Sequence, residues 1–420
     1  MADAHPMTLP RLLQPVSTPV RRALLLFVVG AGFVVSPEPV WSMLFYLLVI
    51  PVQFRALAGA VRDGTVWRDM TPALAVAITM ILWFVLGLAW DRSAAGHPRV
   101  QGLWVWNGFC TLLFVWGCHE AFTRSAAWRD RLITVMIVCG TLNAWIAMLR
   151  LPFLHSVLDQ DSLRMPGWAE TRHPILGAVI IGVPVLLTAS RLLQRRAVWA
   201  NAFALASCLG FIALTGSRGP ILAIGGALTL LLAMARPRLL AIAVAAALVV
   251  LCLVAFLTPS VLAAVWHGFT DRGSSDRLLI WRLSLHAIGT SPWVGLGPTA
   301  RMDRVNEGFP HNLFLSTLFY AGAVGLVMLL TLLALVGRID WRRPPGVDRS
   351  MRIALLVYPM LAGMTDLSIL IKGPAPMWYM VWLPLIICMG TDDPSDGAEL
   401  CRAGAASGIG APVPASGSPV

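Results

Sequence analysis

The chain has 420 residues, of which 57% are hydrophobic and only 13% charged, and its mean hydropathy is +0.74. This composition excludes an ordinary soluble globular domain, which carries about twice that share of charge. A formal net charge of +11 suggests nucleic acid in a soluble protein, but in a membrane protein it must first be divided between the two sides. We therefore expect an all-α polytopic integral membrane protein without a nucleic-acid partner.

Apolar stretches close to the roughly 20 residues that a spanning helix needs recur along the chain. We predict about twelve transmembrane helices, at about 22–36, 39–54, 71–90, 101–120, 132–152, 174–190, 197–214, 219–235, 238–257, 311–336, 351–369 and 375–391. The first two are short, which is compatible with one bent hairpin. Arg21 and Arg22 before the first run are also typical of a signal peptide, but no small-residue cleavage site follows.

Charge partition sets the orientation of these helices. With the N-terminus inside, 20 basic and 11 acidic residues lie inside, which gives a net charge of +9. The other 12 basic and 10 acidic residues lie outside, which gives a net charge of +2. The positive-inside rule therefore predicts that both termini are cytoplasmic. One large outer loop then runs over residues 258–309, and a smaller one runs from Phe153 to His173.

The short connection Thr215-Gly216-Ser217-Arg218-Gly219-Pro220 places an arginine in a tight turn between two predicted spans. Since an arginine at a helix centre costs roughly 2.5–3.5 kcal/mol, this side chain should face water, protein or an anion. The glycines allow close backbone approach, and the following helix offers its N-terminal amides to the same anion. A snorkelling arginine is the simpler alternative.

The large outer loop contains a predicted helix from Arg277 to Ile288, because Leu278, Trp281, Leu285 and Ile288 recur at helical spacing. We expect this amphipathic helix to lie on the outer membrane surface. The segment from Ser291 to Pro298 ends it and turns the chain back towards His311.

Pro310-His311-Asn312 precedes a long apolar helix that runs to about Val336. Asn312 is a good helix start, and Gly322 and Gly325 leave room for another helix to pack closely. A lone histidine before a helix is most often a cap or a solvated side chain, so position alone does not assign it a role.

Two of these motifs together resemble a known family. The H-N-x-x-L start at 311–315 and the T-G-S-R-G-P turn at 215–220 are similar to two signatures of the O-antigen ligase and polymerase family. Arg164-Met165-Pro166-Gly167 before Thr171-Arg172-His173-Pro174 looks like its arginine and glycine loop, although Ile175 stands where the family often has Asn. Asp276-Arg277 and Trp281 resemble its large outer loop.

The resemblance covers roughly residues 150–390 and implies a division of the chain. We expect N-terminal transmembrane helices over 1–150, a ligase-like catalytic membrane region over 151–391 that includes the periplasmic loop 258–309, and a disordered cytoplasmic tail over 392–420. The expected location is the bacterial inner membrane, with the active site on the periplasmic side.

The family's donor is a glycan joined by diphosphate to a polyprenyl (undecaprenyl) lipid, and the acceptor is a hydroxyl of lipid A-core or another saccharide. Arginine suits the diphosphate because its planar fork binds phosphate oxygens bidentately. Histidine suits a general base near neutral pH. The resemblance therefore implies His311 as base and Arg218 on the diphosphate, followed by Arg277, Arg164 and, more weakly, Arg172. Each loop arginine also has a simpler reading as a solvated side chain.

We expect no cofactor and no metal site. The one outer D-x-D pair, Asp159-Gln160-Asp161, is a weak match, and the arginines supply the charge that a divalent ion would otherwise provide. The leading function is a metal-independent O-antigen ligase, and the alternative is an O-antigen or exopolysaccharide polymerase with the same donor. A protein O-oligosaccharyltransferase and a transporter or flippase are less favoured, the latter because the predicted spans are nearly free of charge.

Overall fold

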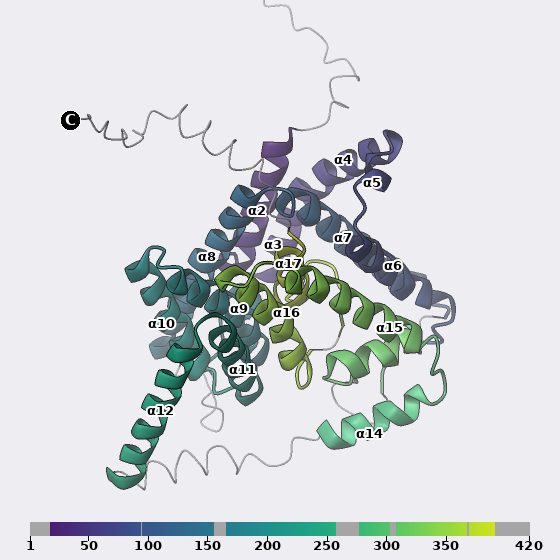
Figure 1. Cartoon of the computed structure of the whole chain (residues 1–420). Helices are drawn as coiled ribbons and strands as arrows, with labels where there is room; N and C mark the ends of the chain where they lie inside the picture. Colours follow the sequence, from purple (N-terminus) through teal and green to yellow (C-terminus); the bar gives the residue numbers. More distant parts are fainter. Residues whose placement is uncertain are drawn as a thin grey trace, which may run out of the picture.

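The computed structural model describes residues 17–93, 95–154, 165–257, 277–302, 308–367 and 369–390. Within these ranges the chain forms helices and no strand (Figure 1). The elements are α2 (Thr18–Val34), α3 (Glu38–Leu44), η1 (Phe45–Val49), α4 (Ile50–Arg62), α5 (Thr65–Arg68), α6 (Pro72–Leu86), η2 (Gly87–Ala89), α7 (Pro98–Phe122), α8 (Ala126–Leu154), η3 (Ala169–Thr171), α9 (Pro174–Leu193), α10 (Val198–Leu214), α11 (Arg218–Ala235), α12 (Pro237–Leu257), α14 (Arg277–Ile288), α15 (Leu313–Trp341), α16 (Val347–Gly363), η4 (Trp378–Trp382) and α17 (Leu383–Met389).

Six helical runs in the described residues are long and apolar enough to cross a membrane: Glu38–Arg62, Pro72–Ala89, Ala126–Arg150, Pro174–Leu193, Arg218–Ala235 and Leu313–Trp341. The all-helical, polytopic class is therefore confirmed. Each of the twelve predicted stretches also contains a helix, but the number of spans stays a prediction. The tail 392–420 and the parts 258–276 and 303–307 of the loop 258–309 lie outside the described residues.

Two predicted spans have different bounds in the structure. The run predicted at 39–54 continues through α4 to Arg62, and the charged residues Arg55 and Arg62 of this extension are exposed. The run predicted at 351–369 leaves the helix after Gly363. There Thr365 donates a hydrogen bond to Asp366, and Asp366 pairs with Arg277, so this segment is a polar turn.

The core of the bundle lies around α9, α16 and α17 (Figure 1). Helix α16 packs against α9, α11 and α15, and α17 packs against α7, α15 and α16. Beside them Trp378 stacks on Phe114, with the ring centroids 4.0 Å apart, and meets Phe45 edge to face. This aromatic contact fixes the chain where it returns to a helix after the polar turn at 364–366.

Helix α15 is broken at Gly322, whose φ of 67° and ψ of −170° are not helical. The sequence predicted an uninterrupted helix in which Gly322 and Gly325 admit a neighbouring helix. Helix α6 does pack against α15, but a Cβ at Gly325 would lie at an ordinary contact distance of 3.7 Å from Trp83, and its close contact would be with Ala321 of the same helix, at 2.3 Å. For Gly322 the prediction is wrong: a Cβ there would overlap the carbonyl of Trp293, and its left-handed backbone favours glycine.

The loop that follows α14 fills this break with backbone hydrogen bonds. The N–H groups of Leu296 and Gly297 donate to the carbonyls of Phe319 and Tyr320, at 2.9 and 3.1 Å. On the other side of the break the Ala323 N–H donates to the Pro292 carbonyl at 2.8 Å. Buried backbone groups that a broken helix leaves without a partner are thus satisfied by a second segment of the chain.

Candidate functional site

Helix α11 begins at Arg218, directly after the predicted turn. Gly216 has a φ of 59°, and Ser217 is extended, so the chain reverses within a few residues. Gly219 lies so close to the turn after α16 that a Cβ would be 2.6 Å from the Asp366 carboxylate and 2.7 Å from the Thr365 hydroxyl. Glycine at 219 therefore lets the first turn of α11 approach these polar groups.

Asp366 binds Arg277, the first residue of α14. The guanidinium of Arg277 pairs with Asp366 Oδ1, while the Thr365 hydroxyl donates to Asp366 Oδ2 at 2.7 Å. The Asp366 side chain is only 3% exposed, so it holds the arginine from within the protein. Sequence analysis did not assign Asp366, although a carboxylate inside a stretch predicted to span the membrane is itself a signal of function.

Asn312 ties the start of α15 to the same turn. Its side-chain oxygen accepts hydrogen bonds from the N–H groups of Phe314 and Leu315, both at 3.0 Å, which confirms the predicted helix start. Its side-chain NH2 donates to the Met364 carbonyl at 2.9 Å. One side chain thus caps α15 and fixes its position against the end of α16.

His311 precedes this cap in a left-handed backbone conformation, with a φ of 51°. The side chain is half-buried, and its ring lies beside that of Phe309, with the centroids 4.5 Å apart. Trp281 of α14 donates its indole N–H to the Pro310 carbonyl at 3.1 Å. A non-glycine residue in this conformation persists only where the surrounding structure holds it, and such residues cluster at functional sites.

The structure therefore gathers three of the predicted residues around one segment, Met364–Asp366. Arg218 starts the helix that lies against it, Arg277 pairs with it, and His311 is adjacent to Asn312, which binds it. These residues come from α11, α14 and the start of α15, which are far apart in the sequence.

The other predicted arginines are placed differently. Arg172 pairs with Glu38 at the start of α3, so its side chain is engaged away from Asp366. Beside it, Glu170 is buried, and in the described residues neither of its carboxylate oxygens has a hydrogen-bond partner. Burial raises the pKa of Glu170 to about 8. Arg164, Asp159 and Asp161 lie outside the described residues.

Helix α14 has the predicted bounds, but its buried face differs from the predicted one. Ile280, Ser284 and Ile288 are buried, whereas Leu278 and Leu285, predicted on the same face as Ile288, are 62% and 57% exposed. The Ser284 hydroxyl donates to the Ile280 carbonyl, so this serine lies against the protein without an unsatisfied polar group. The side of α14 that carries Leu278 and Leu285 is exposed, and its placement on the membrane surface stays a prediction.

The fold and the site together define an integral membrane protein with arginine and histidine side chains gathered at one end of its helices. Residues 202–330, which contain Arg218, Arg277 and His311, match the family model described as O-Antigen ligase. A curated O-antigen ligase of Pseudomonas aeruginosa is 26% identical over 336 residues, which make up 74% of this chain and 82% of that protein. These matches confirm the resemblance to the O-antigen ligase family.

Proposed function

We propose that the protein is a glycosyltransferase of the O-antigen ligase type. It transfers a glycan from polyprenyl diphosphate to a sugar hydroxyl of lipid A-core at the periplasmic face of the bacterial inner membrane. The family match supports a glycosyltransferase-type function in lipopolysaccharide synthesis. The observation that carries the proposal is the convergence of Arg218, Arg277 and His311 on the turn at 364–366.

In this proposal Arg218 and Arg277 bind the donor diphosphate. Arg218 lies at the first turn of α11, where the helix N-terminus also favours an anion, and Asp366 orients the guanidinium of Arg277. When the bond between the sugar C1 and the phosphate oxygen breaks, the lipid diphosphate leaves with the electron pair. Preorganised arginines stabilise that growing charge more in the transition state than in the ground state. Arg164 and Arg172 are proposed as further contacts.

His311 is proposed as the general base. The acceptor hydroxyl forms the new bond to C1 and must lose its proton as it attacks, and a neutral imidazole accepts that proton. The cap at Asn312 and the bond from Trp281 to Pro310 fix the backbone on both sides of His311. The base is therefore positioned by the protein before the acceptor arrives, which favours the chemical step.

Reconstitution tests the reaction directly. Purified protein in proteoliposomes, with donor and lipid A-core acceptor on the same face, is expected to form the joined product, and to do so equally in EDTA. The proposed mechanism needs no divalent ion because the arginines supply the positive charge. In the described residues no three His, Cys, Asp or Glu side chains group as a metal site would require.

Each competing function gives a different outcome in this assay. A polymerase lengthens the glycan on the donor when no lipid A-core is present. A protein O-oligosaccharyltransferase requires a polypeptide acceptor, and a flippase moves the donor across the bilayer without forming a new bond. Loss of activity in EDTA with recovery on adding Mg²⁺ would contradict metal independence and would make Asp159 and Asp161 the residues to mutate.

The proposed orientation gives a separate prediction. A reporter fused after Asp392 should give the signal of a cytoplasmic location, and a reporter inserted within 258–276 should give the signal of a periplasmic location. The reason is that the predicted inner side carries a net charge of +9 and the predicted outer side a net charge of +2. Alkaline phosphatase and a fluorescent protein, which are active on opposite sides, make the measurement. Phosphatase activity of the fusion after Asp392 would overturn the orientation.

A further inference from the structure

A second basic site lies at the end of the bundle opposite to Arg218 and His311. Helix α11 starts at Arg218 and runs 18 residues, about 27 Å at 1.5 Å per residue, before the chain reaches Arg236. Around that point a cleft of about 660 Å³ is lined by five arginines, Arg195, Arg196, Arg236, Arg343 and Arg349. They come from the turn after α9, the end of α11, the connection between α15 and α16, and the first turn of α16.

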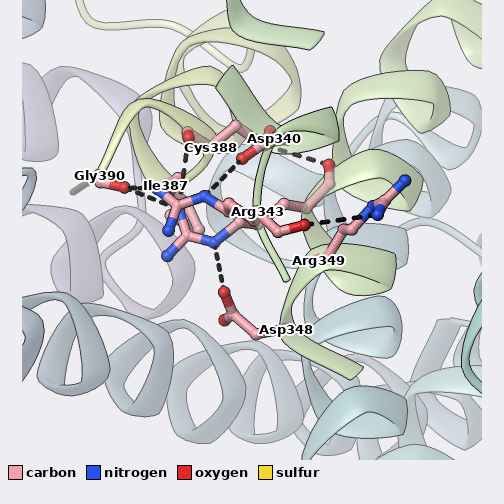
Figure 2. A network of polar contacts seen from close by, with 8 residues as sticks. Asp340, Arg343, Asp348, Arg349, Ile387, Cys388 and Gly390 are labelled. Carbon is pink, nitrogen blue, oxygen red and sulfur yellow. Dashed lines mark hydrogen bonds and ion pairs between the residues drawn. The ribbon is translucent and has the colours of Figure 1, made fainter. Parts of the chain in front are cut away.

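Three residues that line the cleft, Arg343, Asp348 and Arg349, belong to a network of polar contacts (Figure 2). Arg343 pairs with Asp340 at 3.2 Å and donates to the Gly390 carbonyl, and Arg349 donates to the Arg343 carbonyl at 3.4 Å. Asp348, the one carboxylate among the described residues that line the cleft, is paired at 2.7 Å with the buried Arg352. The charge of Asp348 is therefore neutralised by an arginine that does not line the cleft.

The remaining cleft arginines leave a strong positive charge. Arg196 pairs with Asp130 at 3.2 Å. In the part of the chain that the structure describes, no carboxylate pairs with Arg195, Arg236 or Arg349. Guanidinium groups held close together without carboxylates repel one another, and an anion that accepts hydrogen bonds from several of them relieves that repulsion.

Two exposed tryptophans mark the depth of the cleft in the membrane. Trp199 at the start of α10 is 88% exposed, and Trp341 at the end of α15 is 63% exposed. Each is close in sequence to a cleft arginine, and Arg349 lies over the Trp341 ring at 4.4 Å. Tryptophan side chains with this exposure at helix ends are typical of the membrane–water interface. The cleft therefore opens at the level of the lipid headgroups.

We propose that this cleft binds the phosphate of an anionic phospholipid headgroup. Arginine forks match phosphate oxygens, and basic pockets between transmembrane helices are known headgroup sites. A volume of about 660 Å³ is in the range of pockets for small organic molecules, so it accommodates a headgroup with its glycerol rather than a lone phosphate. The inference does not depend on the proposed reaction, because the cleft lies at the other end of α11.

A charge-matched pair of variants tests the proposal by native mass spectrometry of the full chain with phosphatidylglycerol. The cleft variant combines Arg195→Gln, Arg236→Gln and Arg349→Gln. The control combines Arg55→Gln, Arg62→Gln and Arg68→Gln, which remove the same charge. Arg62 ends the span that begins at Glu38, and Glu38 pairs with Arg172 just before α9, so the control lies at the same end as the cleft.

The dissociation constant for phosphatidylglycerol should rise about fivefold for each cleft arginine removed and stay within about twofold in the control. Zwitterionic phosphatidylcholine should bind weakly to both. Equal losses in the two variants would show that general surface charge attracts the lipid, and unchanged binding in the cleft variant would also overturn the proposal. Should the triple variant fail to fold, the three single substitutions are measured, each with the fivefold expectation.

A second measurement separates the two sources of phosphate. Phosphatidylglycerol should raise the thermal unfolding temperature of the native protein in detergent, whereas inorganic phosphate at the same concentration should not. The cleft variant should lose that increase in unfolding temperature. If inorganic phosphate protected the protein as well as the lipid did, the occupant would be a soluble phosphate compound and the lipid assignment would be wrong.

Discussion

His311→Ala is expected to lower the rate of glycan transfer by about 10²–10⁴-fold, the usual contribution of a general base. Binding of the donor should be largely retained, because the proposed diphosphate contacts belong to Arg218 and Arg277. Single-turnover rates and donor binding, measured separately, distinguish the two effects.

His311→Ala needs a matched control because the backbone of His311 is in the left-handed conformation. Its φ of 51° strains an alanine, whereas asparagine adopts the left-handed conformation more readily. His311→Asn should therefore keep the fold, yet it should lose the chemical step as severely as the alanine variant. Asn312→Ser, which retains a capping oxygen, should be milder. Native transfer rates in either His311 variant, or a loss of donor binding as severe as in Arg218→Ala, would contradict the role of base.

Arg218→Lys is expected to lower kcat/KM by about 10- to 100-fold, since hydrogen bonds to charged groups contribute roughly 1.5–3 kcal/mol. Lysine keeps the charge but lacks the planar fork, so bidentate contact with the diphosphate is lost while membrane insertion is unaffected. Arg282→Lys is the control, because Arg282 is exposed on α14. Full activity of Arg218→Lys would show either that a positive charge alone is sufficient at this position or that Arg218 does not belong to the site.

The parts of the site that could be predicted from the sequence are those with local signals. The turn at Arg218, the cap at Asn312 and the helix from Arg277 to Ile288 each depend on residues within a few positions of one another. Asp366 gave only a weak signal, because its partner Arg277 is 89 residues away and its surroundings are apolar enough to be taken for a span. Pairing at that separation depends on the packing of α14 against α15 and of α15 against α16, which sequence periodicity does not reveal.

The break in α15 shows a second limit. Two glycines three positions apart in an apolar run suggest room for a neighbouring helix. The residues that fill the break pair through backbone atoms, which leave no side-chain pattern. The buried face of α14 was also misassigned, because Ser284 is polar yet satisfies its hydroxyl within its own helix. At the break in α15 and on the buried face of α14, hydrogen bonds to backbone groups determine the structure. The hydrophobicity of the sequence alone predicts a different structure at both places.

The same break has a consequence for folding. In a bilayer each backbone group without a hydrogen-bond partner costs several kcal/mol, so α15 cannot be broken while it is surrounded by lipid alone. The partners of Phe319 and Tyr320 are Leu296 and Gly297, which precede α15 in the chain and dock only when the loop after α14 reaches it. The broken form of α15 is therefore stable in a bilayer only together with the loop after α14, so the two segments form one unit of folding.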